Sequence, residues 1–198
     1  MKKITNIIII LIVSVGFLFT EKASAQVKYG PIVGVNGSSL DGLNLGVGFN
    51  AGIFAEVEIL DRFSWRPEFI FSNRASRDKT DGTDPITTNY RISSTDLSIF
   101  SFIVPFSDNL NAHIGSRSSS FRTGTVSTSD SDDTEDFTSG DVSGLFNGVY
   151  VGLMYETVSG LIIEGRFTTA SPGEDSSGGD LSGAYTEFML NFSYKISW

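Results

Sequence analysis

The chain contains a single histidine, His113, which makes this residue the first candidate for acid or base catalysis. Ser116 and Ser118 follow it closely, and a serine activated by a histidine is a common nucleophile. Hydrophobic residues alternate around His113, which predicts a β-strand. On that alternation His113 shares a face with Arg117, away from the apolar face on which an enzyme that cleaves membrane lipids would need it. We therefore expect no catalytic residue and a protein that is not an enzyme.

A second candidate site is the acidic run from Asp130 to Asp136, because carboxylate oxygens bind Ca²⁺. A calcium-binding loop of the EF-hand type requires glycine at its sixth position and glutamate at its twelfth. Counted from Asp130, those positions hold Glu135 and Asp141. We therefore expect a solvated acidic loop over residues 130–136 that at most holds divalent cations loosely. We expect no bound metal and no cofactor.

The composition excludes further classes of function. The 198-residue chain has no cysteine, which excludes disulfides, thiolate metal sites and cysteine nucleophiles. Its net charge of −9 argues against a nucleic-acid partner, because binding phosphates requires clustered lysine and arginine. The 21 glycines, the 16 phenylalanines and the many turn-forming residues favour β-structure.

Residues 1–25 have the features of a secretory signal peptide. Two lysines precede an apolar run over residues 7–19, and residues 23–25 (Ala-Ser-Ala) fit a cleavage site between small residues. A membrane anchor would need about 20 apolar residues, which is more than this run provides. We expect cleavage before Gln26, which leaves residues 26–198 as one domain. Removal of three lysines and one glutamate changes the net charge to −11.

From Val27 onward, hydrophobic residues recur at every second position, which predicts β-strands. The clearest example is Leu45–Ile59, where one face is apolar and the other carries glycine, asparagine and glutamate. The C-terminal segment repeats the pattern. We predict eight strands, over residues 27–36, 45–59, 63–74, 93–106, 110–122, 145–156, 161–171 and 184–198.

The connections between these segments alternate in length. Short turns are expected at residues 60–62, 107–109 and 157–160. Long polar loops are expected at residues 37–44, 75–92, 123–144 and 172–181. In an up-and-down meander, such alternation places the short turns and both termini at one end and the long loops at the other. Most segments also reach the 9–11 residues that a tilted strand needs to cross a bilayer. The predicted fold class is an all-β, eight-stranded antiparallel up-and-down transmembrane β-barrel of the bacterial outer membrane.

The predicted strand faces agree with a lipid-exposed exterior. The apolar faces of 45–57, 65–71, 161–167 and 188–198 carry no charged residue, and lysine or arginine at mid-depth in lipid would cost about 2–4 kcal/mol. The facing of 93–106 stays open, because large apolar residues occupy both of its faces. Aromatic residues near the short-turn end are typical of an interfacial girdle, and they are Tyr29, Trp65, Tyr155, Tyr194 and Trp198.

The opposite faces carry charges of both signs. Carboxylates in this set are candidates for acid–base catalysis, but an eight-stranded barrel is only just wide enough for its own side chains. Buried charges persist when they are paired and hydrogen-bonded. We therefore predict an ion-pair network in the lumen. Its members are Glu56, Glu58, Arg66, Glu68, Glu156, Glu164, Arg166, Glu187 and Lys195.

Three segments carry a resemblance to a known family. They are Tyr29–Asn36 (YGPIVGVN), Gly48–Glu56 (GFNAGIFAE) and Phe63–Phe69 (FSWRPEF). They resemble the first three strands of the PorT-like outer-membrane β-barrel proteins of Bacteroidetes, small barrels of the OmpA/OmpX-like kind. The second of these strands has the pattern G-x-x-A-G-x-F and the third a hydrophobic-x-P-E-hydrophobic pattern. The C-terminal residues Tyr194, Ile196 and Trp198 resemble the signal that the barrel-assembly machinery reads. These motifs are structural, so the resemblance implies a Gram-negative cell-envelope barrel and no particular activity.

We expect a structural or interaction role, exerted through the loops at 75–92 and 123–144 or through the periplasmic rim. The expected partners of a monomeric barrel are outer-membrane lipid and, during biogenesis, the barrel-assembly machinery. Three alternatives stay open. They are a component that supports protein secretion or assembly at the outer membrane, as the resemblance implies, a soluble periplasmic lipocalin-like carrier, and a lipid-modifying outer-membrane enzyme.

Overall fold

The computed structural model of the chain describes residues 27–40, 43–60, 63–79, 87–128, 134–138, 145–172 and 183–196. The expected signal peptide, the acidic residues 130–133 and Trp198 lie outside the described residues. Within the described ranges, no helix has the length and apolarity needed to cross a membrane.

Eleven strands form one antiparallel sheet in the described part of the chain. They are β1 (Val27–Leu40), β2 (Asn44–Leu60), β3 (Phe63–Trp65), β4 (Glu68–Lys79), β5 (Thr87–Ser98), β6 (Ser101–Pro105), β7 (Leu110–Thr128), β8 (Thr134–Thr138), β9 (Leu145–Glu156), β10 (Leu161–Pro172) and β11 (Tyr185–Tyr194).

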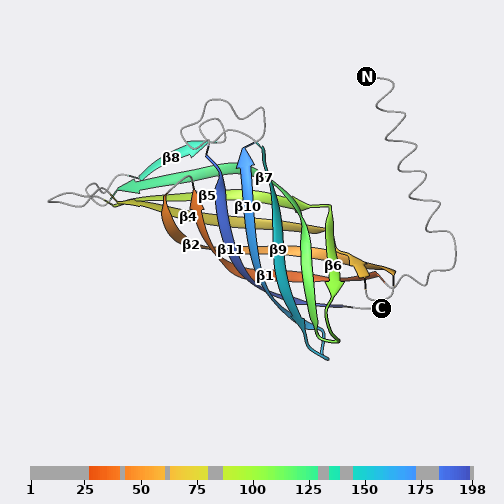
Figure 1. The fold of residues 1–198 in the computed structure, drawn as a ribbon. Coiled ribbons are helices and arrows are strands. Elements are labelled where there is room, and N and C mark those ends of the chain that lie inside the picture. The colour runs from red at the N-terminus through yellow and green to blue at the C-terminus, as the bar shows by residue number, and fades with distance from the viewer. Residues whose placement is uncertain are drawn as a thin grey trace, which may run out of the picture.

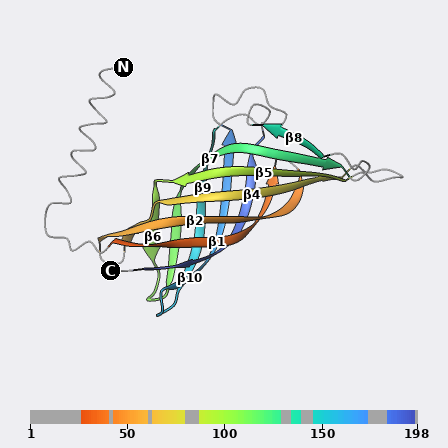
Figure 2. The same cartoon turned by 180° about the vertical axis from the view of Figure 1, so that it is seen from behind.

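The sheet closes on itself, because β1 pairs with β2 on one side and with β11 on the other. The complete ring runs β1-β2-β4-β5-β7-β9-β10-β11 and returns to β1. The first and last strands pair directly, for example at Val33 and Phe192, and a further bridge joins Tyr29 to Ile196. The predicted barrel and its closure between first and last strands are therefore confirmed (Figures 1 and 2).

The structure has eleven strands instead of the eight expected for two reasons. Two of the eight segments that cross the barrel, here called staves, are each interrupted and form two strands, and one further strand, β8, is additional. β3 and β4 form one stave, interrupted at Arg66 and Pro67, where proline cannot donate to the ladder. β5 and β6 form another, interrupted at Ile99 and Phe100. β8 is an additional strand that pairs with the end of β7. Residues 134–136 of the predicted acidic loop therefore form part of a strand, and that part of the loop prediction is wrong.

The break at Ile99 and Phe100 explains why the facing of 93–106 could not be assigned from alternation. Ser98 and Ser101 are both buried, whereas Ile99 and Phe100 between them are both exposed. One extra residue therefore switches the inward positions from even to odd numbers, as a β-bulge does. Both carbonyls of the bulge accept hydrogen bonds, because the Trp65 indole donates to the Ile99 carbonyl at 2.7 Å and the Ser116 amide donates to the Phe100 carbonyl at 2.7 Å.

Three of the expected long loops are shorter than predicted, because their flanking strands continue. β1 runs on to Leu40, into the loop expected at residues 37–44. β4 and β5 stay paired up to Lys79 and Thr87, and β7 runs on to Thr128. The sequence of the last two loops is rich in serine, threonine and asparagine, and composition alone predicts loops there. Threonine favours strands, and the continued ladder satisfies the backbone of each segment. These strands project from the barrel at the end opposite β6, with β8 alongside (Figure 1).

Residues alternate between an exposed outer wall and a buried lumen. On β2, Val47 and Phe49 of the outer face are 68% and 63% exposed, whereas Asn50 of the inward face is 2% exposed. An apolar exterior around a polar interior is the reverse of a water-soluble barrel and fits a lipid environment. The turn between β9 and β10 is closed by Gly160, whose φ of 86° is the left-handed conformation that favours glycine.

Candidate functional site

The centre of the lumen is a buried ion-pair cluster around Arg166 on β10. Its guanidinium donates to Glu68 on β4 at 2.7 Å and to Glu164, two residues away on the same strand, at 2.8 Å. Glu68 also pairs with Arg66 at 3.2 Å. All four side chains are at most 2% exposed. The aromatic ring of Tyr150 covers the Arg166 guanidinium, with 4.4 Å from the guanidinium carbon to the ring centroid.

A chain of hydrogen bonds enters this cluster from the side. The Tyr150 hydroxyl donates to Ser101 Oγ at 2.7 Å. Ser101 Oγ lies 2.7 Å from His113 Nε2, and His113 Nδ1 lies 2.7 Å from Glu164 Oε1. A proton on Nδ1 satisfies every member, since Nδ1 then donates to the carboxylate and Nε2 accepts from the serine. The parity prediction that His113 points inward is therefore confirmed.

The order Ser101–His113–Glu164 is that of a hydrolase triad, and it involves neither Ser116 nor Ser118. The three side chains are at most 2% exposed, whereas a nucleophile must reach its substrate. Tyr150 and Arg166 also complete the hydrogen bonding around them. The arrangement suits a closed structural network.

A second buried cluster surrounds Arg74 on β4, closer to the long-loop end. Arg74 pairs with Asp96 on β5 at 2.7 Å and with Glu187 on β11 at 3.0 Å. Arg117 on β7 pairs with the same Glu187 at 2.8 Å. A cluster of buried apolar side chains lies next to this charged cluster, with the Tyr185 ring against Arg74. Its members are Ile92, Phe121, Phe146, Ala170 and Tyr185.

A third group lies at the short-turn mouth of the barrel. Lys195 Nζ donates to Glu56 at 3.0 Å and to Glu156 at 2.7 Å. The Glu156 side chain is 30% exposed, so this group borders solvent. Arg66 lies 3.7 Å from Glu56 and joins the mouth to the Arg166 cluster.

The structure thus brings together eight of the nine residues expected in the lumen, and Glu58 is the exception. Glu58 is exposed, because it lies at the rim, where the register of β2 and β3 becomes irregular between Glu58 and Leu60. Sequence reasoning missed Arg74, Asp96 and Arg117 as network members, although it had placed Arg117 on the inward face beside His113. Arg74 continues the inward alternation of Glu68, which was an available signal, whereas Asp96 lies on the stave whose facing the bulge obscures.

Three of these residues could in principle hold a metal ion. One ligand atom from each of Glu68, His113 and Glu164 lies within 4.8 Å of the others. The Arg166 guanidinium, however, donates to both carboxylates and lies 3.1 Å from His113 Nδ1. It takes the position that a cation would need, so the donor set is already neutralised by the protein itself.

Two of the three residues expected to act as an assembly signal, Tyr194 and Ile196, lie at the end of β11 and just beyond it, and Trp198 lies outside the described residues. Tyr194 is exposed on the outer wall at the end of β11, and Ile196 bridges to Tyr29 through two backbone hydrogen bonds of 2.8 and 3.1 Å.

No protein-family model and no curated protein matches the chain by sequence. Among solved structures, it is similar to Ail, the attachment invasion locus protein of Yersinia pestis, at 14% identity and a TM-score of 0.50, with 86% of this chain and 99% of Ail covered. Neisserial surface protein A matches at 13% identity and a TM-score of 0.44, with 86% and 97% covered. OprG from Pseudomonas aeruginosa matches at 13% identity and a TM-score of 0.37, with 87% of this chain and 96% of OprG covered.

At such low identity, the likeness to Ail shows the fold alone. That fold, together with the apolar outer wall and the charged lumen, defines the class of small outer-membrane β-barrels.

Proposed function

We propose that this protein is a small barrel of the bacterial outer membrane with a structural or interaction role at its long-loop end. The observation that carries this proposal is the filled lumen. Four arginines, Arg66, Arg74, Arg117 and Arg166, are at most 1% exposed and are held by carboxylates from several strands. A lumen occupied in this way disfavours a channel or a carrier, which leaves the outer surface and the ends of the barrel for function.

The strand extension at the long-loop end supports an interaction role. β4, β5 and β7 continue past the barrel, and β8 pairs with β7 over Thr134–Thr138. Among the described strands, β7 is the only partner of β8. A strand with one open edge can accept an extended segment of another protein by β-augmentation.

The experiment is to replace residues 129–144 with a short Gly-Ser turn and to cross-link intact cells that express the variant. We expect the variant barrel to stay heat-modifiable in SDS gels and to lose the cross-linked complexes formed by the wild type. Replacement of loop 173–182 is the matched control and should keep them. Complexes that persist without residues 129–144 would contradict the proposal.

We also infer that the protein acts without catalysis, as a monomer surrounded by outer-membrane lipid, after insertion by the barrel-assembly machinery. The buried Ser101–His113–Glu164 arrangement supports this inference, since it lies inside the barrel. Lipid profiles of cells with Ser101→Ala in place of the wild type should be unchanged, and an altered acyl pattern would favour a lipid-modifying enzyme.

A finer assignment to the PorT-like family rests on the strand motifs. In β2, a Cβ added at Gly48 would lie 1.8 Å from the Asn73 carbonyl oxygen, so the first glycine of the pattern G-x-x-A-G-x-F has a structural cause in this barrel. A supporting role in protein secretion follows from that resemblance. Deletion of the gene should then lower the secreted protein fraction, and an unchanged secreted fraction would count against this role.

A further inference from the structure

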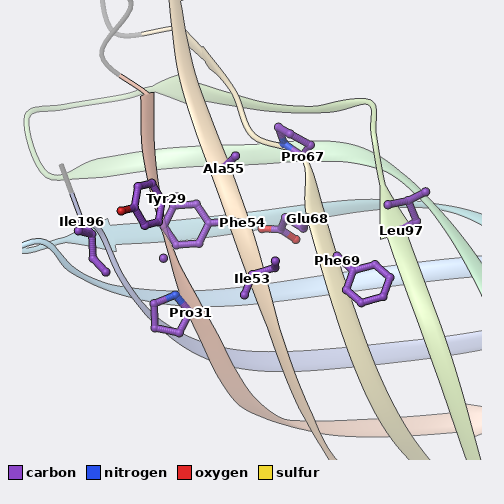
Figure 3. Close-up of a pocket in the computed structure, with 11 residues that line it drawn as sticks. Tyr29, Pro31, Ile53, Phe54, Ala55, Pro67, Glu68, Phe69, Leu97 and Ile196 are labelled. Carbon is purple, nitrogen blue, oxygen red and sulfur yellow. The ribbon is translucent and has the colours of Figure 1, made fainter. Parts of the chain in front are cut away.

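An apolar groove of about 620 Å³ crosses the outer wall near the short-turn end of the barrel. Its lining comes from three neighbouring segments (Figure 3): Tyr29 and Pro31 of β1, Ile53 and Ala55 of β2, Phe69 of β4, and Pro67 just before β4. Ala55 pairs with Tyr29 across the strands. Its single methyl group leaves open the space that a longer side chain would fill.

A polar hollow of about 390 Å³ lies beside this groove at the rim. It is lined by Lys28, Glu156, Tyr194 and Lys195, and Ile196 borders both the hollow and the groove. The backbone bridge between Ile196 and Tyr29 holds the two together. The apolar groove and the charged hollow are therefore neighbours that share Ile196 as a lining residue.

The depth of the polar hollow matches that of lipid headgroups. Tyr29 and Tyr194 are 37% and 48% exposed on the outer wall, and exposed tyrosines of this kind anchor at the membrane–water interface. Lys195 is already held by Glu56 and Glu156, so Lys28 is the cation that we assign to an incoming anion. The Glu156 carboxylate is 30% exposed and can accept from a second donor.

We propose that the groove and the hollow together bind one zwitterionic phospholipid. One acyl chain lies in the groove, the phosphate meets Lys28, and the headgroup ammonium meets Glu156. The pairing of an anion and a cation with opposite charges of the protein distinguishes this lipid from an anionic one, which lacks the ammonium. This inference goes beyond the proposed role of the long loops and does not depend on it.

The test measures lipid retention by native mass spectrometry of the full chain, purified from membranes in mild detergent and incubated with phosphatidylethanolamine or phosphatidylglycerol. We expect one retained lipid per barrel, with phosphatidylethanolamine preferred. Ala55→Phe fills the groove and should lower the lipid-bound fraction at least fivefold. Ala51→Phe, on the same face of β2 but outside the groove, is the matched control and should leave it unchanged.

Two headgroup variants sharpen the assignment. Lys28→Gln should weaken retention of both lipids, whereas Glu156→Gln should remove the preference for phosphatidylethanolamine. Each variant is first checked for heat-modifiable folding, and Ala55→Leu replaces Ala55→Phe if the latter does not fold. Equal retention by the Ala55 and Ala51 variants would overturn the proposal. So would a lipid-free barrel, or a dimer that forms in place of lipid binding, and none of these outcomes bears on the long-loop role.

Discussion

The deep lumen and the short-turn mouth hold charges from the same inward alternation, but in different surroundings. In the deep lumen, Arg166 and its partners Glu68 and Glu164 are removed from solvent. At the mouth, Lys195 pairs with Glu156, whose side chain is 30% exposed to solvent. When a charged side chain in the deep lumen loses its partner, no water can take the partner's place. At the mouth, solvent water can hydrate the charge that is left. The value of an ion pair in this barrel therefore depends on depth, although the sequence pattern is the same.

The largest effect is expected from breaking the deep cluster. Arg166→Ala leaves Glu68 and Glu164 under-compensated and should lower the free energy of unfolding by about 3–5 kcal/mol. Guanidinium unfolding in lipid vesicles, followed by tryptophan fluorescence, measures this loss. Addition of Glu68→Gln to the same chain should restore part of it, because the two residues are coupled. A double variant no more stable than Arg166→Ala would mean that the pair is not the source of the loss.

The lipid-facing wall provides the next largest effect and tests depth on the outside. Phe167 lies midway along β10 and pairs with Val151 and Phe188. Phe167→Arg should lower the free energy of unfolding by about 2–4 kcal/mol. Ile163 lies on the same face beside Tyr155 of the girdle, so Ile163→Arg should cost about 1 kcal/mol or less. Equal losses in the two variants, measured by the same unfolding titration, would contradict the assigned membrane depth.

The hydrogen-bond chain beside the deep cluster is expected to have an intermediate effect. Ser101→Ala removes the hydroxyl that joins Tyr150 to His113 and leaves two buried polar atoms without that partner. The expected loss is about 1–3 kcal/mol. Ser116→Ala, on the neighbouring strand but outside the chain of hydrogen bonds, is the control and should change stability by less than about 0.5 kcal/mol. A loss as large for Ser116→Ala would remove the special position of Ser101.

The smallest effect is expected at the mouth. Glu156→Gln leaves Lys195 paired with Glu56 and should change the free energy of unfolding by about 0–1 kcal/mol, with even less at high salt. Titrations at low and high salt measure both the value and its salt dependence. A loss near that of Arg166→Ala would show that the mouth is as closed as the deep lumen.

The sequence was sufficient where alternation is unbroken. β9 has the predicted bounds, Leu145–Glu156, and the inward placement of Glu164 and Arg166 follows from a period of two. It was insufficient where the structure adds a residue to a strand or carries a polar strand beyond the membrane. Asp96 was missed because a bulge a few residues away made the facing of its stave ambiguous. The extension of β5 and β7 was missed because composition does not distinguish a polar loop from a polar strand that has a neighbour to pair with.

The lumen partners themselves were harder to predict than the lumen residues. Alternation places a side chain inside, but register decides which strand supplies its partner. Arg166 donates to Glu68 across the barrel, 98 residues away in sequence. A local sequence pattern cannot predict a pair with that separation.

The bulge at Ile99 and Phe100 has a consequence for how relatives of this barrel can vary in length. Loss of one of the two residues would leave a single outward residue between Ser98 and Ser101, so regular alternation would be restored with both serines still inward. Loss of both residues would instead turn Ser101 toward lipid and Phe102 toward the interior, which would exchange a hydroxyl for an aromatic ring. In an alignment, a gap of one residue at this position should therefore occur together with His113, whereas a gap of two should coincide with its loss.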